Sequence, residues 1–217
     1  MTKTIVRKQT VGEEIANSVS HGVGAVLSVA GTAVMIVYAC FKSDVFGVVG
    51  ASIFGFGLIV LYTMSTLYHA LTNARAKKVF QILDHSSIFF LILGTYTPIC
   101  LVSMRGTIGW TLFGVNAALT AAGVTLSAAA SKKFAKMSIA VYLLMGWSVV
   151  FAIKPVLDVF AGKNLTLLIA GGLCYTVGVV FYKNKQIKFM HSVWHMFVLG
   201  GSVCHYFFIL FYVLPIR

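Results

Sequence analysis

The sequence predicts an all-α integral membrane protein with seven transmembrane helices. Of its 217 residues, 59% are hydrophobic and only 10% are charged, so the chain carries more apolar surface than a soluble domain of this length can bury. The charged side chains fall in short clusters that separate long uncharged stretches. These stretches are long enough to cross the hydrocarbon core of a bilayer, for which a helix needs roughly 17–25 residues.

We expect a single domain over residues 1–217, built from these helices. The approximate spans are 17–41, 45–69, 82–104, 107–130, 137–157, 164–182 and 190–213. The fifth span contains the shortest uncharged stretch and reaches past Lys154, whose ammonium can extend to the interface. We expect no cleavable signal peptide, because the first apolar stretch is too long for the apolar core of one.

The basic residues predict a cytoplasmic N-terminus and an external C-terminus. Twelve of the 17 lysines and arginines fall on the side that holds the N-terminus, and lysine and arginine in short loops favour the cytoplasm. They are Lys3, Arg7, Lys8, Arg75, Lys77, Lys78, Lys132, Lys133, Lys136, Lys183, Lys185 and Lys188. The other side holds Lys42, Arg105, Lys154, Lys163 and Arg217.

The same charge pattern argues against a nucleic-acid-binding protein. Such a protein would interleave its basic residues with aromatic residues on an exposed face, whereas here they anchor the ends of apolar stretches. The four cysteines are Cys40, Cys100, Cys174 and Cys204, and all lie inside apolar stretches without a close pair. Neither a disulfide framework nor a cysteine metal site is therefore expected.

Polar residues of four predicted helices converge on one depth of the membrane. The residues are Glu13, Asn17 and His21 before and in the first span, Ser65 and His69 in the second, Asp84 and His85 in the third, and His191 and His195 in the last. With the predicted topology, all of them lie in the cytoplasmic third of the bilayer. Ionisable groups are costly at this depth, so the convergence indicates a functional site.

The histidines in this set have the spacing of metal ligands. His191 and His195 lie one helical turn apart on one face, and His69 is the best third ligand from another helix. Three neutral imidazoles can bind Zn²⁺ and leave a fourth position for water, as in catalytic zinc sites. Asp84 could orient that water or accept its proton, and Ser65 could donate to a developing oxyanion.

Each residue taken alone has a simpler interpretation. A single histidine in a membrane helix more often forms an interhelical hydrogen bond, which is our interpretation of His205, and the role of His85 stays open. Ser65 could bond its own helix backbone, Asp84 could pair with a loop lysine, and Glu13 with Asn17 could cap the first helix. These interpretations do not explain why the residues share one depth.

The motifs Glu13-x3-Asn17-x3-His21, Ser65-x3-His69 followed by Asp84, and His191-x3-His195 closely resemble those of the bacterial hemolysin III proteins. That group belongs to the progestin and adipoQ receptor family, which in turn resembles the alkaline ceramidases. The resemblance covers nearly the whole chain and implies zinc bound by His69, His191 and His195, with Asp84 holding the zinc-bound water and Ser65 beside the metal. Glu13, Asn17 and His21 would support the site structurally. It also implies a bacterial plasma membrane location.

The leading hypothesis is therefore a zinc-dependent hydrolase of lipid-like amides or esters, with a membrane lipid or fatty-acid-like ligand. One alternative is a membrane-lytic protein, as the family label implies. Another is a receptor or sensor of membrane state with a structural zinc, which would use a fourth protein ligand. A zinc transporter would need a polar pathway through the outer halves of the helices, and the sequence lacks one. Neither the substrate nor the oligomeric state follows from the sequence.

Overall fold

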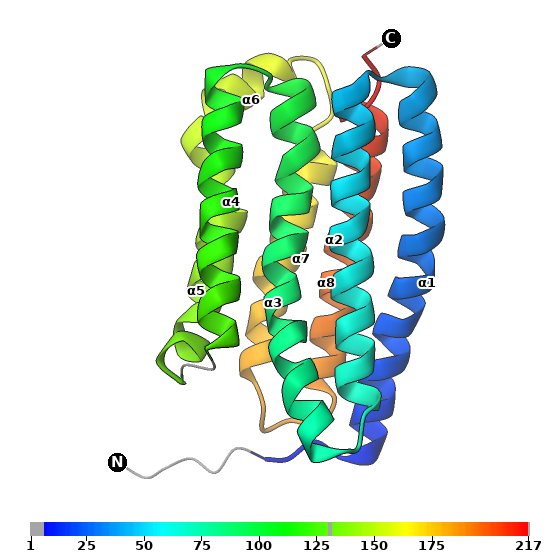
Figure 1. Cartoon of the computed structure of the whole chain (residues 1–217), viewed down its shortest axis with the longest axis vertical. Coiled ribbons are helices and arrows are strands. Elements are labelled where there is room, and N and C mark those ends of the chain that lie inside the picture. The colour runs from blue at the N-terminus through cyan, green and yellow to red at the C-terminus, as the bar shows by residue number, and fades with distance from the viewer. Residues whose placement is uncertain (1–6, 130–131, 217) are drawn as a thin grey trace.

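A computed structural model describes residues 7–129 and 132–216 of the chain as a bundle of upright helices (Figure 1). The helices are α1 (Val11–Lys42), α2 (Val45–Ala70), α3 (Ala74–Pro98), α4 (Thr107–Ala128), α5 (Lys132–Gly146), α6 (Ile153–Val159), α7 (Thr166–Lys183) and α8 (Met190–Phe208). Lys3 and Arg217, counted for the topology, and residue 130, the end of one predicted span, lie outside the described residues.

Within the described residues, seven helical segments are long and apolar enough to cross a membrane, and no strand occurs there. The predicted fold class is confirmed, and the protein is a multi-pass integral membrane protein. The fifth crossing, Met137–Val159, joins α5 to the short α6 through a 3₁₀ turn at Ser148–Ala152. This break precedes Pro155, which has no backbone N–H to donate and whose ring would clash with the carbonyl of residue 151 in a regular α-helix.

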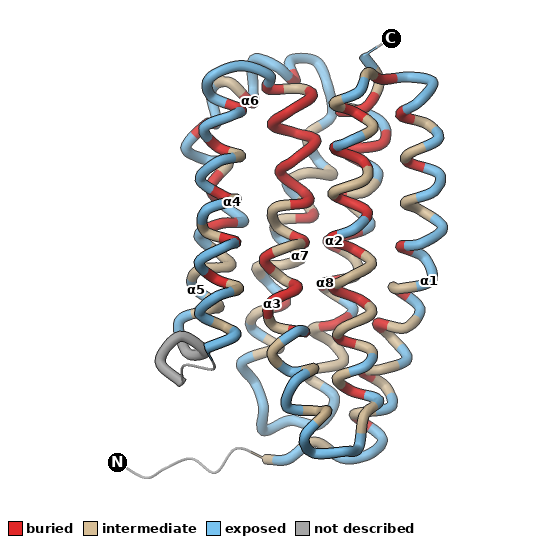
Figure 2. Tube along the Cα trace, in the orientation of Figure 1, coloured by how far each residue is buried: buried red, intermediate tan, exposed pale blue. Residues whose placement is uncertain are grey.

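Helix α3 forms the centre of the bundle. In its most apolar part, 72% of the residues are buried, compared with 22% in α1 and 11% in α7 (Figure 2). The outer helices instead expose valine, leucine and phenylalanine side chains, including Val26 of α1 and Phe151 at 85% of its surface. Apolar exposure of this kind is expected where side chains face lipid.

The packing of α3 against α2 depends on glycine. A Cβ atom added to Gly57 of α2 would lie 2.8 Å from the carbonyl oxygen of Phe90, and one added to Gly50 would lie 2.9 Å from the Cα of Pro98. The two backbones are thus in direct contact, as small residues permit in membrane helices. Helix α3 passes at Pro98 into a π-helical turn over Ile99–Ser103.

Polar caps fix where the helices begin. Thr10 and Glu13 form a reciprocal capping box, so α1 already begins at Val11, before the predicted crossing at residue 17. Asp44 caps α2 and accepts a 2.6 Å hydrogen bond from Arg105 of the α3–α4 connection. Burial raises the pKa of the Asp44 carboxyl, but Arg105 and the backbone N–H groups of the cap outweigh that effect and hold it below its usual 3.8.

The connections alternate between two ends of the bundle (Figure 1). The N-terminal segment and the α2–α3, α4–α5 and α7–α8 connections lie at one end, and the C-terminus and the remaining connections lie at the other. The loops that carry most of the basic residues thus share one end. That this end is cytoplasmic stays a prediction from the charge count.

Candidate metal centre

Three histidines from two helices meet at the end of the bundle that holds the N-terminus. His69 lies in the last turn of α2, and His191 and His195 lie in the first two turns of α8. One ring nitrogen from each falls within 4.8 Å of the others, so the three could hold a metal ion. Within the described residues, no fourth histidine, cysteine, aspartate or glutamate joins this group.

The spacing of the nitrogens fits a metal. The Nε2 atoms of His69 and His191 are 3.2 Å apart. Two nitrogens bound to one tetrahedral zinc at ~2.0–2.1 Å lie about 3.3–3.4 Å apart, so this pair needs little movement to bind the ion. The ring nitrogen of His195 lies within 4.8 Å of the other two and would have to move closer to them to bind the same ion. Without a metal, the same pair can share a single hydrogen bond, in which one ring donates to the other.

His195 has the protonation pattern of a metal ligand. Its Nδ1 lies 3.2 Å from the backbone carbonyl oxygen of Asn17. A carbonyl can only accept, so this contact places the proton of a neutral ring on Nδ1 and leaves the lone pair on Nε2. That Nε2 is buried and has no hydrogen-bond partner among the described residues. An unpaired acceptor in a buried site is costly, and a metal ion would satisfy it.

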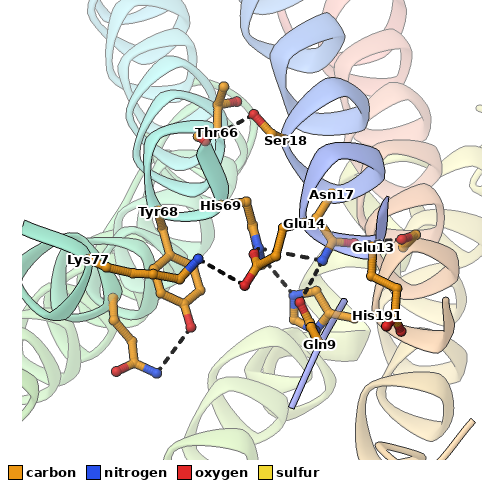
Figure 3. Close-up of polar contacts among 12 residues, drawn as sticks. Gln9, Glu13, Glu14, Asn17, Ser18, Thr66, Tyr68, His69, Lys77 and His191 are labelled. Atoms are coloured by element: carbon orange, nitrogen blue, oxygen red, sulfur yellow. Dashed lines mark hydrogen bonds and ion pairs between the residues drawn. The ribbon is translucent and has the colours of Figure 1, made fainter. Parts of the chain in front are cut away.

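His69 shows the same pattern. Its Nδ1 lies 2.7 Å from a carboxylate oxygen of Glu14, and its Nε2 faces His191 (Figure 3). The amide nitrogen of Asn17 is a more distant neighbour of the same Nδ1, at 3.4 Å. In a neutral His69 or His195, these contacts leave Nε2 without a proton, and Nε2 of His69 faces His191.

The first motif surrounds these histidines. Asn17 is fully buried; its side-chain oxygen accepts a 2.6 Å hydrogen bond from Ser192 of α8, and its amide donates to Gln9. His21 stacks on the ring of His195, with centroids 3.5 Å apart. Both motif residues thus connect α1 with α8, and the structural role predicted for them stays a prediction.

Glu13 connects the segment before α1 with the residue before α8. Its carboxylate accepts hydrogen bonds from the Arg7 guanidinium, from Thr10 and from the backbone N–H of Phe189, the residue before α8. Phe189 has a left-handed backbone, with φ of 63°, and the carboxylate holds that turn in place. The hydrogen bond to the Glu13 carboxylate raises the pKa of the Arg7 guanidinium, and this effect exceeds the opposite effect of burial.

Asp84 and Ser65 lie beside the histidine group rather than within it. Both are buried, at 7% and 1% exposure, and Ser65 lies one helical turn before His69 on α2. The Ser65 oxygen makes no hydrogen bond of ordinary length among the described residues. Their predicted roles in catalysis stay predictions.

A cavity of about 150 Å³ adjoins this site. Its lining includes His21, Asp84 and His85 at the end near the histidine group, and Tyr96 and Trp147 further into the bundle. Along α3, Tyr96 lies 12 positions after Asp84, which corresponds to about 18 Å at 1.5 Å per residue. The space resembles that of a cavity able to hold a benzene ring, so it fits part of a hydrocarbon chain.

The two remaining histidines have different surroundings. His85 lines the cavity, and its backbone carbonyl accepts a hydrogen bond from Tyr142. His205 places its Nε2 3.2 Å from the carbonyl oxygen of Leu168 on α7, which is the interhelical hydrogen bond expected for it.

Three residues of this site were missed by the sequence analysis, namely Glu14, Ser192 and Ser20. The Ser20 hydroxyl lies 3.2 Å from Nδ1 of His195 and donates to the backbone carbonyl of Asn17. Glu14 lies three residues before Asn17 and therefore on the same face of α1, and this spacing could have indicated it. The two serines carry no such signal, because serine is common in packed membrane helices.

Comparisons with known proteins agree with the motifs. A family model described as "Haemolysin-III related" matches residues 9–206. Hemolysin-3 of Bacillus cereus is 41% identical over 216 residues, which cover 99% of each chain. The Hemolysin-3 homolog of Bacillus subtilis (strain 168) is 40% identical over 207 residues, 95% of this chain and 97% of the relative.

A more distant similarity extends to animals. The monocyte to macrophage differentiation factor of Homo sapiens is 28% identical over 209 residues, 92% of this chain and 84% of the relative. No solved structure matches the chain. Because the family model covers most of the sequence and both bacterial relatives align along nearly all of it, the protein belongs to the haemolysin-III-related family.

Proposed function

We propose that the protein is a zinc-dependent hydrolase of lipid-like amides or esters. The observation that carries the proposal is the group of three histidines whose ring nitrogens lie within 4.8 Å of one another. Nε2 of His69 faces His191, Nε2 of His195 is buried without a partner among the described residues, and Asp84 lines the adjoining cavity. Nitrogen ligands with one open position are typical of catalytic zinc. The family match supports the assignment of the three ligands.

The residues around the group suit hydrolysis. A zinc ion held by the three histidines would act as a Lewis acid and make a water molecule nucleophilic near neutral pH. Asp84 would accept the proton of the attacking water and pass it to the leaving group. Ser65, one helical turn from His69 on α2, would donate a hydrogen bond to the oxyanion that develops on the substrate carbonyl.

The cavity supports a substrate with a hydrocarbon chain. It extends from Asp84 into an apolar region between α3, α5, α7 and α8, where Ile88, Ile92 and Val179 form part of its wall. A chain bound there would place its carbonyl at the polar end and its tail among apolar side chains. We therefore expect a membrane lipid or a fatty-acid-like molecule as ligand, with a fatty amide such as a ceramide as one substrate.

The test is to compare Asp84→Asn and Ser65→Ala with wild type in detergent, at matched zinc content, on ceramides and long-chain esters. Asp84→Asn keeps the shape of the side chain but removes its basicity, so we expect activity to fall by ~10²–10⁴-fold. Ser65→Ala should cost less, about 10–100-fold, if it is one of several oxyanion donors. Asp158→Asn is the matched control, because Asp158 is an exposed carboxylate of α6.

The proposal is contradicted if zinc-loaded wild type turns over none of these lipids, or if Asp84→Asn matches the Asp158→Asn control. A zinc-binding protein without turnover would favour the sensor of membrane state. Direct membrane lysis is the second candidate, favoured by the names of the two bacterial relatives. Release of dye from vesicles that contain no hydrolysable lipid would separate lysis from hydrolysis.

A further inference from the structure

We propose that Glu14 is a positioning residue for the metal centre. It holds His69 in the tautomer and orientation that a metal ligand needs. The inference rests on the metal site of the proposed function and not on hydrolysis. Glu14 is distinct from Glu13, whose carboxylate binds the N-terminal segment and the backbone before α8.

The geometry of the contact is specific. The Oε2 atom of Glu14 lies 2.7 Å from Nδ1 of His69, which is the length of a charge-assisted hydrogen bond. The His69 ring is almost fully buried, while the Glu14 side chain is about one quarter exposed. Figure 3 shows His69 close to both Glu14 and His191.

The contact decides which nitrogen of His69 carries a proton. An ionised carboxylate can only accept, so the proton of a neutral ring lies on Nδ1 and the lone pair on Nε2. That lone pair faces Nε2 of His191, 3.2 Å away, where the metal would bind. A carboxylate on the far nitrogen also makes the ring a stronger ligand, and metal-ligating histidines commonly have such a partner.

The other carboxylate oxygen of Glu14 has a separate, partly exposed partner. This Oε1 atom accepts a 2.8 Å hydrogen bond from the ammonium of Lys77, at the start of α3. Glu14 therefore connects α1 with both α2 and α3, and each carboxylate oxygen has its own partner. The ion pair between Lys77 and Glu14 is partly exposed to solvent and by itself contributes little to the stability of the fold.

The competing interpretation is that Glu14 only ties the α2–α3 connection to α1. The two interpretations differ in which contact matters. If Glu14 is a tether, removing Lys77 should have the same effect as removing Glu14. If Glu14 positions His69, zinc affinity should fall only in variants that change the contact between Glu14 and the His69 imidazole.

The experiment measures zinc affinity of the purified full-length protein by competition with a chelator of known affinity. We expect Glu14→Ala to weaken zinc binding by about 10–100-fold, the usual effect of removing such a partner of a ligating histidine. Glu14→Gln can still accept through its amide oxygen but carries no charge, so a smaller loss is expected. Lys77→Met, which leaves the Glu14–His69 contact intact, should bind zinc as wild type does.

A spectroscopic readout accompanies the affinity. Cobalt(II) bound in place of zinc reports ligand geometry through its visible absorption bands, which should change in Glu14→Gln and not in Lys77→Met. Wild-type affinity in Glu14→Ala overturns the inference, as does an equal loss in Lys77→Met. If Glu14→Ala does not fold, wild-type affinity and spectrum in Glu14→Gln overturn it. If wild type itself binds no zinc, the metal site fails and this inference with it.

Discussion

The structure buries several imidazoles side by side. His21, His69 and His195 are each less than 5% exposed, and the rings of His21 and His195 are stacked in direct contact. Protonation of such neighbours would place like charges together in a medium that solvates them poorly. The rings are therefore neutral, which is the form that binds a metal.

The first prediction concerns the third ligand. Purified wild type should contain about one zinc per chain, and His195→Ala should lose most of it, because the substitution removes one of three protein ligands. Metal analysis of both proteins in the same detergent measures the effect.

The matched control is His205→Gln. His205 lies on the same helix and is buried to a similar degree, but it bonds a backbone carbonyl away from the histidine group. Full zinc content in His195→Ala, or equal loss in His205→Gln, would show that His195 is not a ligand.

Sequence spacing predicts part of this site well. His191 and His195 must share a face of a helix, and the alternation of the spans must bring His69 to the same end of the bundle. The spacing of Glu14 to Asn17 could indicate Glu14 as a site residue, but not that it, rather than Glu13, meets His69. Adjacent residues of a helix point about 100° apart, and the packing of α1 against α2 decides which one reaches that ring. The carbonyl of Asn17 as partner of His195 was equally hidden, since a backbone contact carries no residue signature.

At the scale of elements, the sequence predicts which segments are helical better than where they begin, bend or touch. The capping box at Thr10 extends α1 beyond its apolar part, and the 3₁₀ turn at Ser148–Ala152 interrupts a stretch that is uniformly apolar. Hydropathy reports burial in lipid and contains no information about such changes of helical geometry. Contacts between helices depend on where small residues face one another.

The second prediction tests the contact between α2 and α3. In Gly57→Ala the new methyl group would meet the backbone of Phe90, which cannot rotate away, so we expect a loss of about 1–3 kcal/mol in unfolding free energy. Gly114→Ala of α4 is the control, since a Cβ there has nothing within 4 Å. It should be neutral or gain about 0.5–1 kcal/mol through helix propensity.

Thermal unfolding of both variants in one detergent measures the difference. A midpoint for Gly57→Ala equal to that of Gly114→Ala would mean that the two helices can separate without cost, contrary to the packing described. The measurement also bears on the site, because α2 carries His69 and α3 carries Asp84.

For the whole molecule, the third prediction concerns orientation. The α2–α3 connection should face the cytoplasm, because twelve of 17 basic residues lie on its side. In a variant without native cysteines, a cysteine at Lys77, or at the exposed Lys78, should resist a membrane-impermeant thiol reagent added to intact cells. A cysteine at Ala161, an exposed position between α6 and α7, should react.

Labelling at 77 or 78 in intact cells, with protection at 161, would invert the topology and place the histidine group on the outer side. Labelling of both positions after the cells are opened provides the control for reactivity. Residue 78 is the cleaner position, since Lys77 pairs with Glu14.

The hydrogen bond between Glu13 and the backbone of Phe189 has a consequence for biosynthesis. It joins the first turn of the first helix to the entrance of the last one, 176 positions later in the chain. His69 leaves the ribosome long before His191 and His195, so a nascent chain offers the ion a single imidazole from this group until its final helix has entered the bilayer. A metal held by these three histidines would therefore bind late in membrane insertion, and a loaded centre would mark a chain whose first and last helices have met.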